Sequence, residues 1–309
     1  MQTGGLYADA SVSYTPLYMP SPFIGEGYSM RGCSPVAGLC KSSIKQMNCE
    51  FNALLSVIRA NTEREARRRL IIYTDGPLVE RHLSAQSAFC RACVAMGYLT
   101  AAQMERAARR YRLGMSRDGG VIFWQINQLG LVYDGKVMYY RSDCHRDHGR
   151  LPTWVSYVLR SFYLGEASDI VVPTVHCLFG THLLSNDNVN VPVDVPVAVV
   201  EAEKTAVILS EVFPQYLWLA AGGLHELTME KLFALRHHRV VLFPDTDPQR
   251  QAFTLWYEIA RKARRSYGMQ ITVSALLERR ATADQKRRKI DLVDFYFESQ
   301  RMGAPNAPL

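Results

Sequence analysis

The stretch Val197-Ala-Val-Val-Glu-Ala-Glu-Lys204 decides the fold of this chain, because a short apolar run ends abruptly in charged residues. Two further apolar runs end in glycines or acids: Tyr216-Leu-Trp-Leu-Ala-Ala221 before Gly222-Gly223, and Arg239-Val-Val-Leu-Phe243 before Pro244-Asp-Thr-Asp247. Such short runs predict buried strands. In an open α/β sheet, ligands bind beyond the carboxyl ends of the strands. The pattern therefore predicts a site for a divalent metal ion and phosphate at that edge, which favours nucleic-acid chemistry.

Strand and helix patterns alternate through the rest of this region. Strands are predicted near 197–200, 216–221, 239–243 and 269–273, and helices near 203–213, 227–235, 248–266 and 291–298. Such alternation is typical of a parallel sheet covered by helices. We therefore predict an α/β domain over residues 196–298 with a parallel sheet of about four strands, followed by a tail over 299–309.

The acidic residues at the strand ends suit a metal ion. Residues i and i+2 of an extended segment face the same side, so Asp245 and Asp247 can point together just beyond a strand. Glu201, at the end of a neighbouring strand, can add a third carboxylate and can act on a proton. Mg²⁺ takes one or two carboxylates, several waters and substrate phosphates, so we expect Mg²⁺ or Mn²⁺ here. A turn or a helix N-cap remains the alternative explanation of an Asp-x-Asp pair.

The chain before residue 196 divides into segments of different composition. Residues 1–42 are rich in Gly, Ser, Pro and Tyr, which predicts a poorly ordered lead. Residues 43–113 predict helices, including 85–96 and 100–111. Residues 114–195 predict an antiparallel meander, a helix and a linker; the turns are expected at 127–130 and 134–135, the helix at 152–162 and the linker at 185–194.

The order of these segments resembles the Toprim domain that DnaG-type primases, topoisomerases and some nucleases share. The motifs that carry the resemblance are Val199-Val-Glu-Ala-Glu-Lys-Thr-Ala206, Leu219-Ala-Ala-Gly-Gly223, Val241-Leu-Phe-Pro-Asp-Thr-Asp247 and Lys289-Ile-Asp-Leu-Val-Asp-Phe295. Upstream, Tyr111-Arg-Leu-Gly114, Val121-Ile-Phe-Trp-Gln-Ile126, Gly135-Lys-Val-Met-Tyr139 and Leu178-Phe-Gly-Thr-His-Leu183 follow the order seen in DnaG-like and plasmid or phage primases. The layout from about Ala101 is similar to uncharacterised Toprim-containing proteins of Bacteroidetes mobile elements.

The resemblance implies a fold and roles for several acidic residues. It implies a Rossmann-like Toprim domain, preceded by a small α+β, DnaG-like basic subdomain that helps to hold a template. Glu201 would be the general acid/base or a metal-linked carboxylate. Asp245 and Asp247 would hold Mg²⁺, and Asp291 would provide an outer acid.

Other positions of the resembling motifs either support or weaken this assignment. Gly222 and Gly223 would let phosphate or metal approach the backbone closely, and Lys204 would pair with a carboxylate or a phosphate. Three departures put primer initiation by this chain alone in doubt. Ala202 replaces the usual middle glycine, Pro248-Gln-Arg250 replaces the common Ala-Gly, and no zinc ribbon precedes the core.

The charge of the chain suits a polyanionic partner. The 309 residues carry a formal net charge of +7, and segment 261–289 holds ten lysines and arginines against two acidic residues. Within it, Arg261, Arg264 and Arg265 are candidate phosphate contacts, with a solvated helix face as the alternative.

Basic and aromatic residues also lie together in the predicted meander. Lys136 and Arg141 are near Trp124, Tyr139 and Tyr140, a combination that suits single-stranded nucleic acid through phosphate contact and base stacking. Because one face of a sheet belongs to the core, we expect Tyr140 or Lys136 to point outward and Trp124 to be packed.

The cysteines favour a reduced, cytoplasmic protein. They number seven and are irregularly spaced. Cys90-x-x-Cys93, together with Cys144, His145 and His148, is compatible with a zinc site, but the first pair lies in an apolar helical stretch, which favours core thiols. No apolar run approaches the roughly 18 residues of a membrane span, and no signal segment is evident.

Together these features predict a primase-like, Mg²⁺-dependent nucleotidyltransferase. It would act on single-stranded DNA with NTPs in the replication of a plasmid or mobile element, with a helicase or another replication protein as partner. A Toprim-type nuclease needs the same acids but not the β-rich subdomain. A non-catalytic nucleic-acid-binding accessory protein is the third alternative, and a topoisomerase would need further domains.

Overall fold

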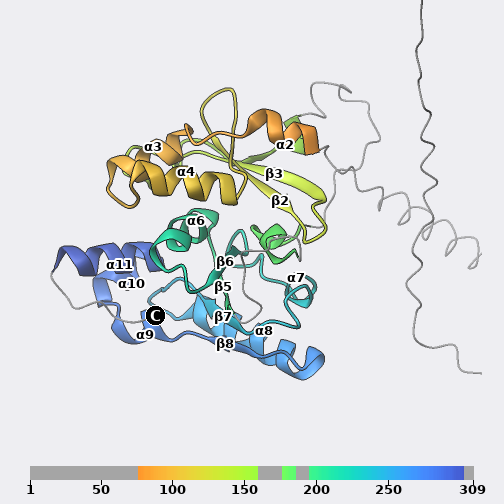
Figure 1. Ribbon diagram of the computed structural model, residues 1–309. Coiled ribbons are helices and arrows are strands. Elements are labelled where there is room, and N and C mark those ends of the chain that lie inside the picture. Colours follow the sequence, from red (N-terminus) through yellow and green to blue (C-terminus); the bar gives the residue numbers. More distant parts are fainter. Residues whose placement is uncertain (1–75, 159–175, 186–194, 303–309) are drawn as a thin grey trace, which may run out of the picture. The chain divides into compact units, whose positions relative to one another are not determined.

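A four-stranded parallel sheet organises the C-terminal part of the protein, in a computed structural model that describes residues 76–158, 176–185 and 195–302 (Figure 1). The strand order is β6-β5-β7-β8, and all neighbouring strands pair in parallel. The strands are β5 (Val197–Val200), β6 (Leu217–Ala220), β7 (Val240–Phe243) and β8 (Ile271–Val273). The predicted α/β class and its four parallel strands are confirmed.

Six helices follow the strands of this sheet within the described residues. They are α6 (Glu203–Val212), α7 (Met229–Phe233), α8 (Gln251–Tyr267), α9 (Leu276–Arg280), α10 (Ala283–Arg288) and α11 (Leu292–Arg301). Four of them match predicted helices, and α11 runs past residue 298 into the predicted tail. The short helices α9 and α10 were not predicted, because one or two turns show too little periodicity. A capping box of Thr282 with Gln285 begins α10.

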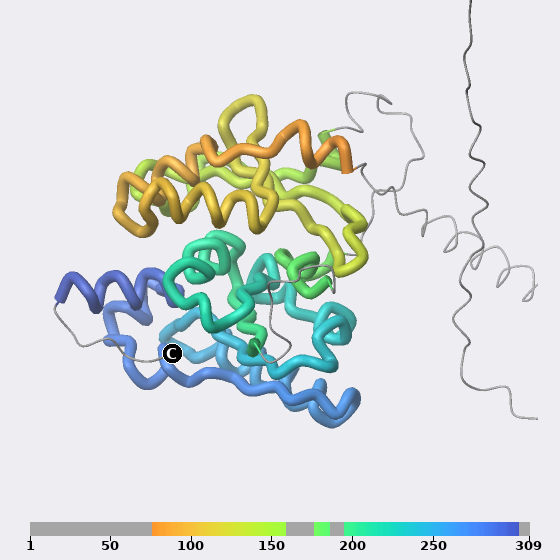
Figure 2. The backbone as a smooth tube through the Cα atoms, viewed as in Figure 1, coloured from red at the N-terminus to blue at the C-terminus, as the bar shows by residue number. Residues whose placement is uncertain are grey.

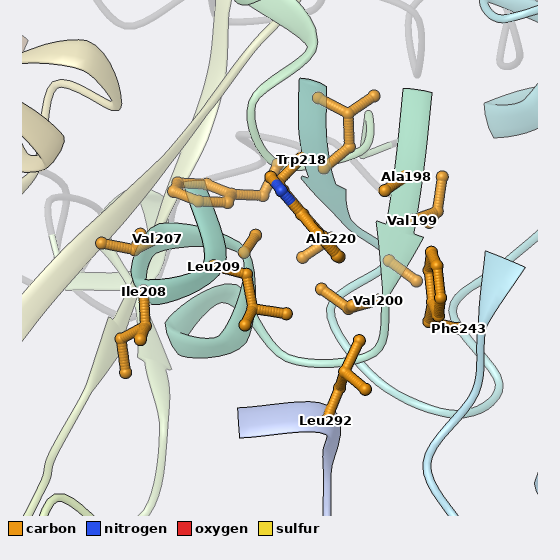
Figure 3. Close-up of a cluster of buried hydrophobic side chains, with 14 of the residues drawn as sticks. Ala198, Val199, Val200, Val207, Ile208, Leu209, Trp218, Ala220, Phe243 and Leu292 are labelled. Atoms are coloured by element: carbon orange, nitrogen blue, oxygen red, sulfur yellow. The ribbon is translucent and has the colours of Figure 1, made fainter. Parts of the chain in front are cut away.

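The central strand β5 is buried along its whole length, as expected for a parallel strand covered by helices. Figure 3 shows Val200 of β5 in one cluster with Leu209 of α6, Phe243 of β7 and Leu292 of α11. Burying an aliphatic side chain of this size contributes about 1.5–3 kcal/mol. This apolar packing therefore fixes the end of β5, and with it the position of the charged residues that follow.

A second, antiparallel sheet precedes the parallel one. Its strands are β1 (Gly114–Met115), β2 (Val121–Ile126), β3 (Val132–Met138) and β4 (Thr153–Trp154), in that order. The predicted meander and its turn at 127–130 are confirmed. In that turn the Asn127 carbonyl accepts a 3.0 Å bond from the Gly130 N–H, and the Asn127 side chain accepts bonds from the N–H groups of Leu129 and Leu131.

The turn predicted at 134–135 is wrong, because β3 runs through both residues. Gly135 lies opposite Trp124 in the sheet, and a Cβ atom at Gly135 would come within 2.7 Å of the indole ring. The buried carboxylate of Asp134 accepts hydrogen bonds from the N–H groups of Gly135 and Ser156. The glycine therefore makes room for a neighbouring ring, and the aspartate holds the segment after β4.

The two sheets share one apolar core with the helices α3 (Ala88–Ala95) and α4 (Ala101–Arg110), whereas α2 (Gly76–His82) packs Val79 into a second, smaller cluster with the antiparallel sheet. Figure 2 traces α4 beside α6, and the two helices are in contact. Tyr111, at the end of α4, donates a 2.8 Å hydrogen bond to the Trp218 carbonyl of β6 and stacks on Phe179. Phe179 precedes the short helix η1 (Thr181–Leu184) and exchanges backbone hydrogen bonds with Ala220.

Several predictions fall partly or wholly outside the described residues. These are the lead over 1–42, the first predicted helix after residue 43 and the linker over 186–194. The helix predicted over 152–162 begins later, since Thr153–Trp154 form β4 and residues 155–158 are helical. Within the described ranges, no helix combines the length and apolar composition that a membrane crossing needs.

Candidate active site

Glu201 and Asp245 lie next to each other at the carboxyl edge of the parallel sheet. Glu201 follows β5 directly, and Asp245 follows the adjacent strand β7 by two residues. The Oε1 atom of Glu201 accepts a 3.1 Å hydrogen bond from the backbone N–H of Asp245. This bond holds the Glu201 carboxylate against the backbone of Asp245. The structure therefore brings these two predicted site residues together.

Both acids resist ionisation in this position. Burial raises the pKa of Glu201 to about 7; the charges of Asp247 and Asp291 add to this rise, and the hydrogen bond from Asp245 opposes it. Burial and then the charge of Glu201 raise the pKa of Asp245 well above its usual value. In the described part of the chain, no hydrogen bond or ion pair reaches the carboxylate of Asp245. The pair therefore lacks a paired counter-charge.

Asp247 is buried and caps a helix. Its Oδ1 atom accepts a 2.9 Å bond from the Gln249 N–H, and its Oδ2 atom accepts a 3.0 Å bond from the Ala252 N–H at the start of α8. Burial works to raise the pKa of Asp247, but the N–H donors and Lys289 hold it below its usual value. For Asp247, the structure therefore shows the helix-capping role that was the alternative explanation of the Asp-x-Asp pair. Its metal role stays a prediction, since each carboxylate oxygen keeps a further lone pair.

Asp291 is fully engaged by its neighbours. Its Oδ1 atom accepts a 2.8 Å hydrogen bond from the Asp294 N–H at the start of α11. Its Oδ2 atom accepts a 2.7 Å bond from the Thr205 hydroxyl and lies 3.3 Å from the Lys204 ammonium. Burial works to raise the pKa of Asp291, but Lys204 and these hydrogen bonds hold it below its usual value. Lys204 was expected to pair with a carboxylate or a phosphate, and in the structure it pairs with the Asp291 carboxylate.

Lys136 reaches from β3 to the parallel sheet instead of pointing outward as expected. Its ammonium lies 3.0 Å from the buried Glu203 carboxylate and donates a 2.8 Å hydrogen bond to the Gly222 carbonyl. Gly222 and Gly223 have φ values of 98° and 154°, which non-glycine residues rarely adopt. These conformations present the Gly222 carbonyl to the lysine.

Trp124 and Tyr140 of the predicted meander are both buried, and Tyr139 is partly buried. The expected packing of Trp124 is confirmed, because its side chain is inaccessible to solvent. The expectation that Tyr140 points outward is wrong. Its ring packs against Phe89 and Phe123 in the core, where burial raises its pKa well above the usual value.

A pocket of about 530 Å³ opens over the acidic pair. The acids Glu201, Asp245, Asp291 and Asp294, both glycines and Lys204 contribute to its lining. Basic and imidazole side chains also line it, among them His145, Arg146, His148, Arg288 and Lys289. All five of these are exposed. They were not predicted as site residues, because the loop over 141–150 and the end of α10 meet only in the folded chain.

Apart from Lys136, which lines this pocket, the predicted nucleic-acid residues are not among the described residues that line it. Arg141 pairs with Asp143 at 2.7 Å, and Arg261 bonds to Glu258 in its own helix. Arg264 donates to the Ile271 carbonyl at 2.9 Å, and Arg265 is exposed. At 1.5 Å of rise per residue, Arg261 lies roughly 15 Å along α8 from its first turn, where Asp247 caps it. Their phosphate contacts stay predictions.

The donor set fits a divalent cation of the Mg²⁺ type. Among the described residues, no group of three or more His, Cys, Asp or Glu side chains forms a ready-made metal cluster. Mg²⁺, however, needs only one or two carboxylates, because waters and substrate phosphates complete its shell. Glu201 and Asp245 offer hard oxygen donors, and burial raises the pKa of both. Mn²⁺ suits the same donors.

The cysteine pattern considered for zinc lies in the apolar core. The Sγ atoms of Cys93 and Cys144 are 3.3 Å apart, and the Ser87 hydroxyl contacts Cys90 at 3.1 Å. Burial raises the pKa of Cys90 to about 11, so this thiol stays protonated, whereas zinc binds the thiolate. His145 and His148 line the acidic pocket instead. The preference for core thiols agrees with this arrangement.

A larger cavity of about 810 Å³ lies near the end of α4 and the turn at 127–130. Its arginines are already paired: Arg109 with Glu105, Arg110 with Glu211 and Arg112 with Glu80. It contains no acidic residue in its lining. We therefore place the chemistry in the smaller pocket, where unpaired acids and bases face one space.

Comparisons with known proteins give one family and several structural neighbours. A family model described as "Domain of unknown function (DUF6371)" matches residues 91–246. No curated protein matches the chain. One neighbour is the primase fragment of the bacteriophage T7 primase-helicase protein, at 16% identity and a TM-score of 0.35 over 55% of this chain and 60% of that one.

Two further solved structures are DnaG proteins. The DnaG primase catalytic domain bound to ssDNA is 15% identical with a TM-score of 0.43, over 79% of this chain and 84% of that one. The DnaG catalytic core is 15% identical with a TM-score of 0.41, over 74% and 82%. Likeness at this level assigns no activity to the chain.

Proposed function

Because the chain belongs to the DUF6371 family, whose description assigns no activity, we propose a function from the site itself: primase-like nucleotidyl transfer that depends on Mg²⁺ or Mn²⁺. Single-stranded DNA is the proposed template and NTPs are the proposed substrates. In this proposal the parallel-sheet region over 196–298 is a Toprim-type domain, and residues 114–195 form a basic subdomain that helps to hold the template. The proposed setting is the replication of a plasmid or mobile element, with a helicase or another replication protein as partner.

One observation carries the proposal: unpaired acids and unpaired bases face the same pocket. Glu201 and Asp245 line the pocket without a paired counter-charge. Arg146 and Lys289 are exposed in the same lining, and neither forms an ion pair within the described ranges. A metal-bound nucleotide matches this arrangement, since it presents a cation to the acids and phosphate oxygens to the bases.

In this proposal the acidic side chains would bind the cation, and the basic side chains would contact the phosphates. Asp245 and Glu201 would hold the cation, which would neutralise the triphosphate and the charge that develops on it. Asp247 would keep the loop between them and α8 in place by capping that helix. Arg146, His148 and Lys289, which line the same pocket, would orient the phosphates. Most of the catalysis would then come from positioning and electrostatics.

Proton transfer is assigned to Glu201. In nucleotidyl transfer, a hydroxyl oxygen forms a bond to the α-phosphorus, the bond to pyrophosphate breaks, and the hydroxyl proton leaves. A carboxylate beside the attacking hydroxyl can accept that proton as a general base. Oε1 of Glu201 is fixed by the Asp245 N–H, which leaves Oε2 for this task or for the cation.

A primer-synthesis assay tests the proposal. The protein is incubated with single-stranded DNA, labelled NTPs and Mg²⁺ or Mn²⁺, beside Asp245→Asn and the matched control Asp284→Asn. Within the described ranges, Asp284 is an exposed acid that pairs with Arg287 and Arg288 of its own helix and does not line the pocket. We expect new labelled oligonucleotides from wild type and Asp284→Asn, and a loss of at least about 100-fold in Asp245→Asn.

Other outcomes of this assay contradict the proposal in different ways. Shortened DNA, lost in Asp245→Asn, would identify a metal-dependent nuclease. DNA binding that survives Asp245→Asn without any product would identify an accessory protein.

A further inference from the structure

We propose that Lys204 acts as a built-in cation that occupies Asp291, so that the pocket binds a single divalent ion, on Glu201 and Asp245. This inference rests on the proposed metal-dependent function and specifies its metal site. It assigns Asp291 to an internal ion pair instead of the outer metal position that the sequence resemblance implied. Lys204 then becomes a positioning residue, because it acts on the site through Asp291.

The bonding of Asp291 is the first ground for this assignment. One oxygen holds the Asp294 N–H at 2.8 Å, and the other holds the Thr205 hydroxyl at 2.7 Å and the Lys204 ammonium at 3.3 Å. Asp291 is only 5% exposed. A divalent ion at this carboxylate would have to displace the ammonium and leave it buried without a partner, which is strongly unfavourable.

The placement of Lys204 is the second ground. Lys204 is the second residue of α6, and the positive end of the helix dipole disfavours a cation there. The lysine is nevertheless 9% exposed and therefore mostly withdrawn from water. Burial lowers its pKa, but the charges of Asp291 and Asp294 outweigh this effect and raise the pKa above its usual value. Its carboxylate partners are therefore what hold it in place.

The balance of charge in the pocket is the third ground. Two lysines neutralise two acids as close pairs, Lys136 with Glu203 and Lys204 with Asp291. Asp294 lies 3.8 Å from the imidazole of His145. Glu201 and Asp245 remain without a paired cation. Two-metal sites place their ions about 3.5–4 Å apart between shared carboxylates, and here an ammonium stands beside the acid that a second ion would need.

Manganese titration followed by electron paramagnetic resonance tests the inference, since it counts bound ions without requiring catalysis. We expect one Mn²⁺ per wild-type chain. Asp291→Asn keeps the acceptor for the Asp294 N–H, and we expect it to bind one ion with affinity within about threefold of wild type. Asp245→Asn should weaken binding at least about tenfold, because it removes a proposed ligand.

Substitutions of Lys204 test the role of the ammonium itself. Lys204→Met frees Asp291, so we expect a second Mn²⁺ to bind, whereas Lys204→Arg keeps the positive charge and should bind one ion. Circular dichroism checks that each variant is folded. If Lys204→Met does not fold, Lys204→Met with Asp291→Asn removes both charges, and this double variant should fold and bind one ion.

Each failure has a distinct meaning. Two ions in the wild type, or at least tenfold weaker binding in Asp291→Asn, would overturn the inference and leave the proposed function standing. A folded Lys204→Met that still binds one ion would also overturn it. No Mn²⁺ binding by the wild type would overturn the proposed metal-dependent function and, with it, this inference.

Discussion

The carboxyl group of Glu201 links the stability of the protein to pH. The unfolded chain loses this proton near pH 4.5, whereas the folded chain keeps it until about pH 7. Between these values the folded state binds more protons than the unfolded state. The contribution of Glu201 to the free energy of unfolding therefore falls as pH rises from about 4.5 to 7, and it stays constant above that range.

We predict that Glu201→Gln removes this fall in stability. Glutamine keeps an acceptor for the Asp245 N–H but carries no charge, so the metal-free variant should gain on the order of 1–3 kcal/mol over wild type above pH 7. Urea unfolding of both proteins from pH 5 to 8 measures the difference. Burial lowers the pKa of His182 to about 4, which gives an opposite slope, but this slope is common to both proteins. If the free energies of unfolding of wild type and Glu201→Gln changed in parallel with pH, the prediction would be contradicted.

Asp245 and Asp247 should respond in opposite ways to the loss of their carboxylates. Asp247→Ala removes the acceptor for two backbone N–H groups at the start of α8, so we expect a loss of about 1–2 kcal/mol. Asp245→Ala removes no hydrogen bond of the side chain and relieves repulsion from Glu201, so the metal-free protein should be equally or more stable. Urea unfolding in the presence of a chelator measures the stability of both variants. Equal losses in the free energy of unfolding would refute this division of roles.

At the scale of secondary-structure elements, Lys136 connects the two sheets. It extends from β3 to Glu203, the first residue of α6, and to the Gly222 carbonyl after β6. The Glu203 residue is only 1% exposed. The lysine therefore holds the antiparallel sheet against the edge of the parallel sheet where the acidic pocket opens.

We predict that Lys136→Met destabilises the protein by about 3–5 kcal/mol, because it leaves the Glu203 charge buried without its partner. Adding Glu203→Gln should recover much of this loss. Arg141→Met serves as the control, since Arg141 forms an exposed pair with Asp143 and should change stability by less than about 1 kcal/mol. Denaturant unfolding of wild type and these three variants measures the losses. A loss below about 1 kcal/mol in Lys136→Met would contradict the role of Lys136 in joining the two sheets.

The sequence predicts elements well where apolar runs are long or buried on both sides, as in β5 and α8. The prediction fails where the role of a residue is a contact with another residue that is distant in the sequence. Asp134-Gly135 has the composition of a turn, yet the glycine accommodates Trp124 and the aspartate binds Ser156. Likewise, the acidic half of the pocket follows from strand ends, whereas Arg146 and Lys289 become visible only when two loops meet.

At the scale of the whole molecule, two groups of basic residues are separate in the described part of the chain. One group lines the acidic pocket, and the other extends along the exposed end of α8, where Arg261, Lys262 and Arg265 face solvent. The first group suits a bound nucleotide, and the second suits a longer polyanion that contacts the surface. The net charge of +7 is therefore compatible with a polyanionic partner, but it does not identify the pocket where a nucleotide would bind.

Binding of a fluorescent NTP with and without Mg²⁺ tests most directly whether the acidic pocket is a metal–nucleotide site. We predict that Mg²⁺ tightens nucleotide binding by wild type at least about tenfold, because the ion joins the phosphates to Glu201 and Asp245. Asp245→Asn should bind the nucleotide equally with and without Mg²⁺, whereas Asp284→Asn should behave like wild type. Nucleotide binding that ignores Mg²⁺ in the wild type, or that depends on it equally in Asp245→Asn, would contradict the account.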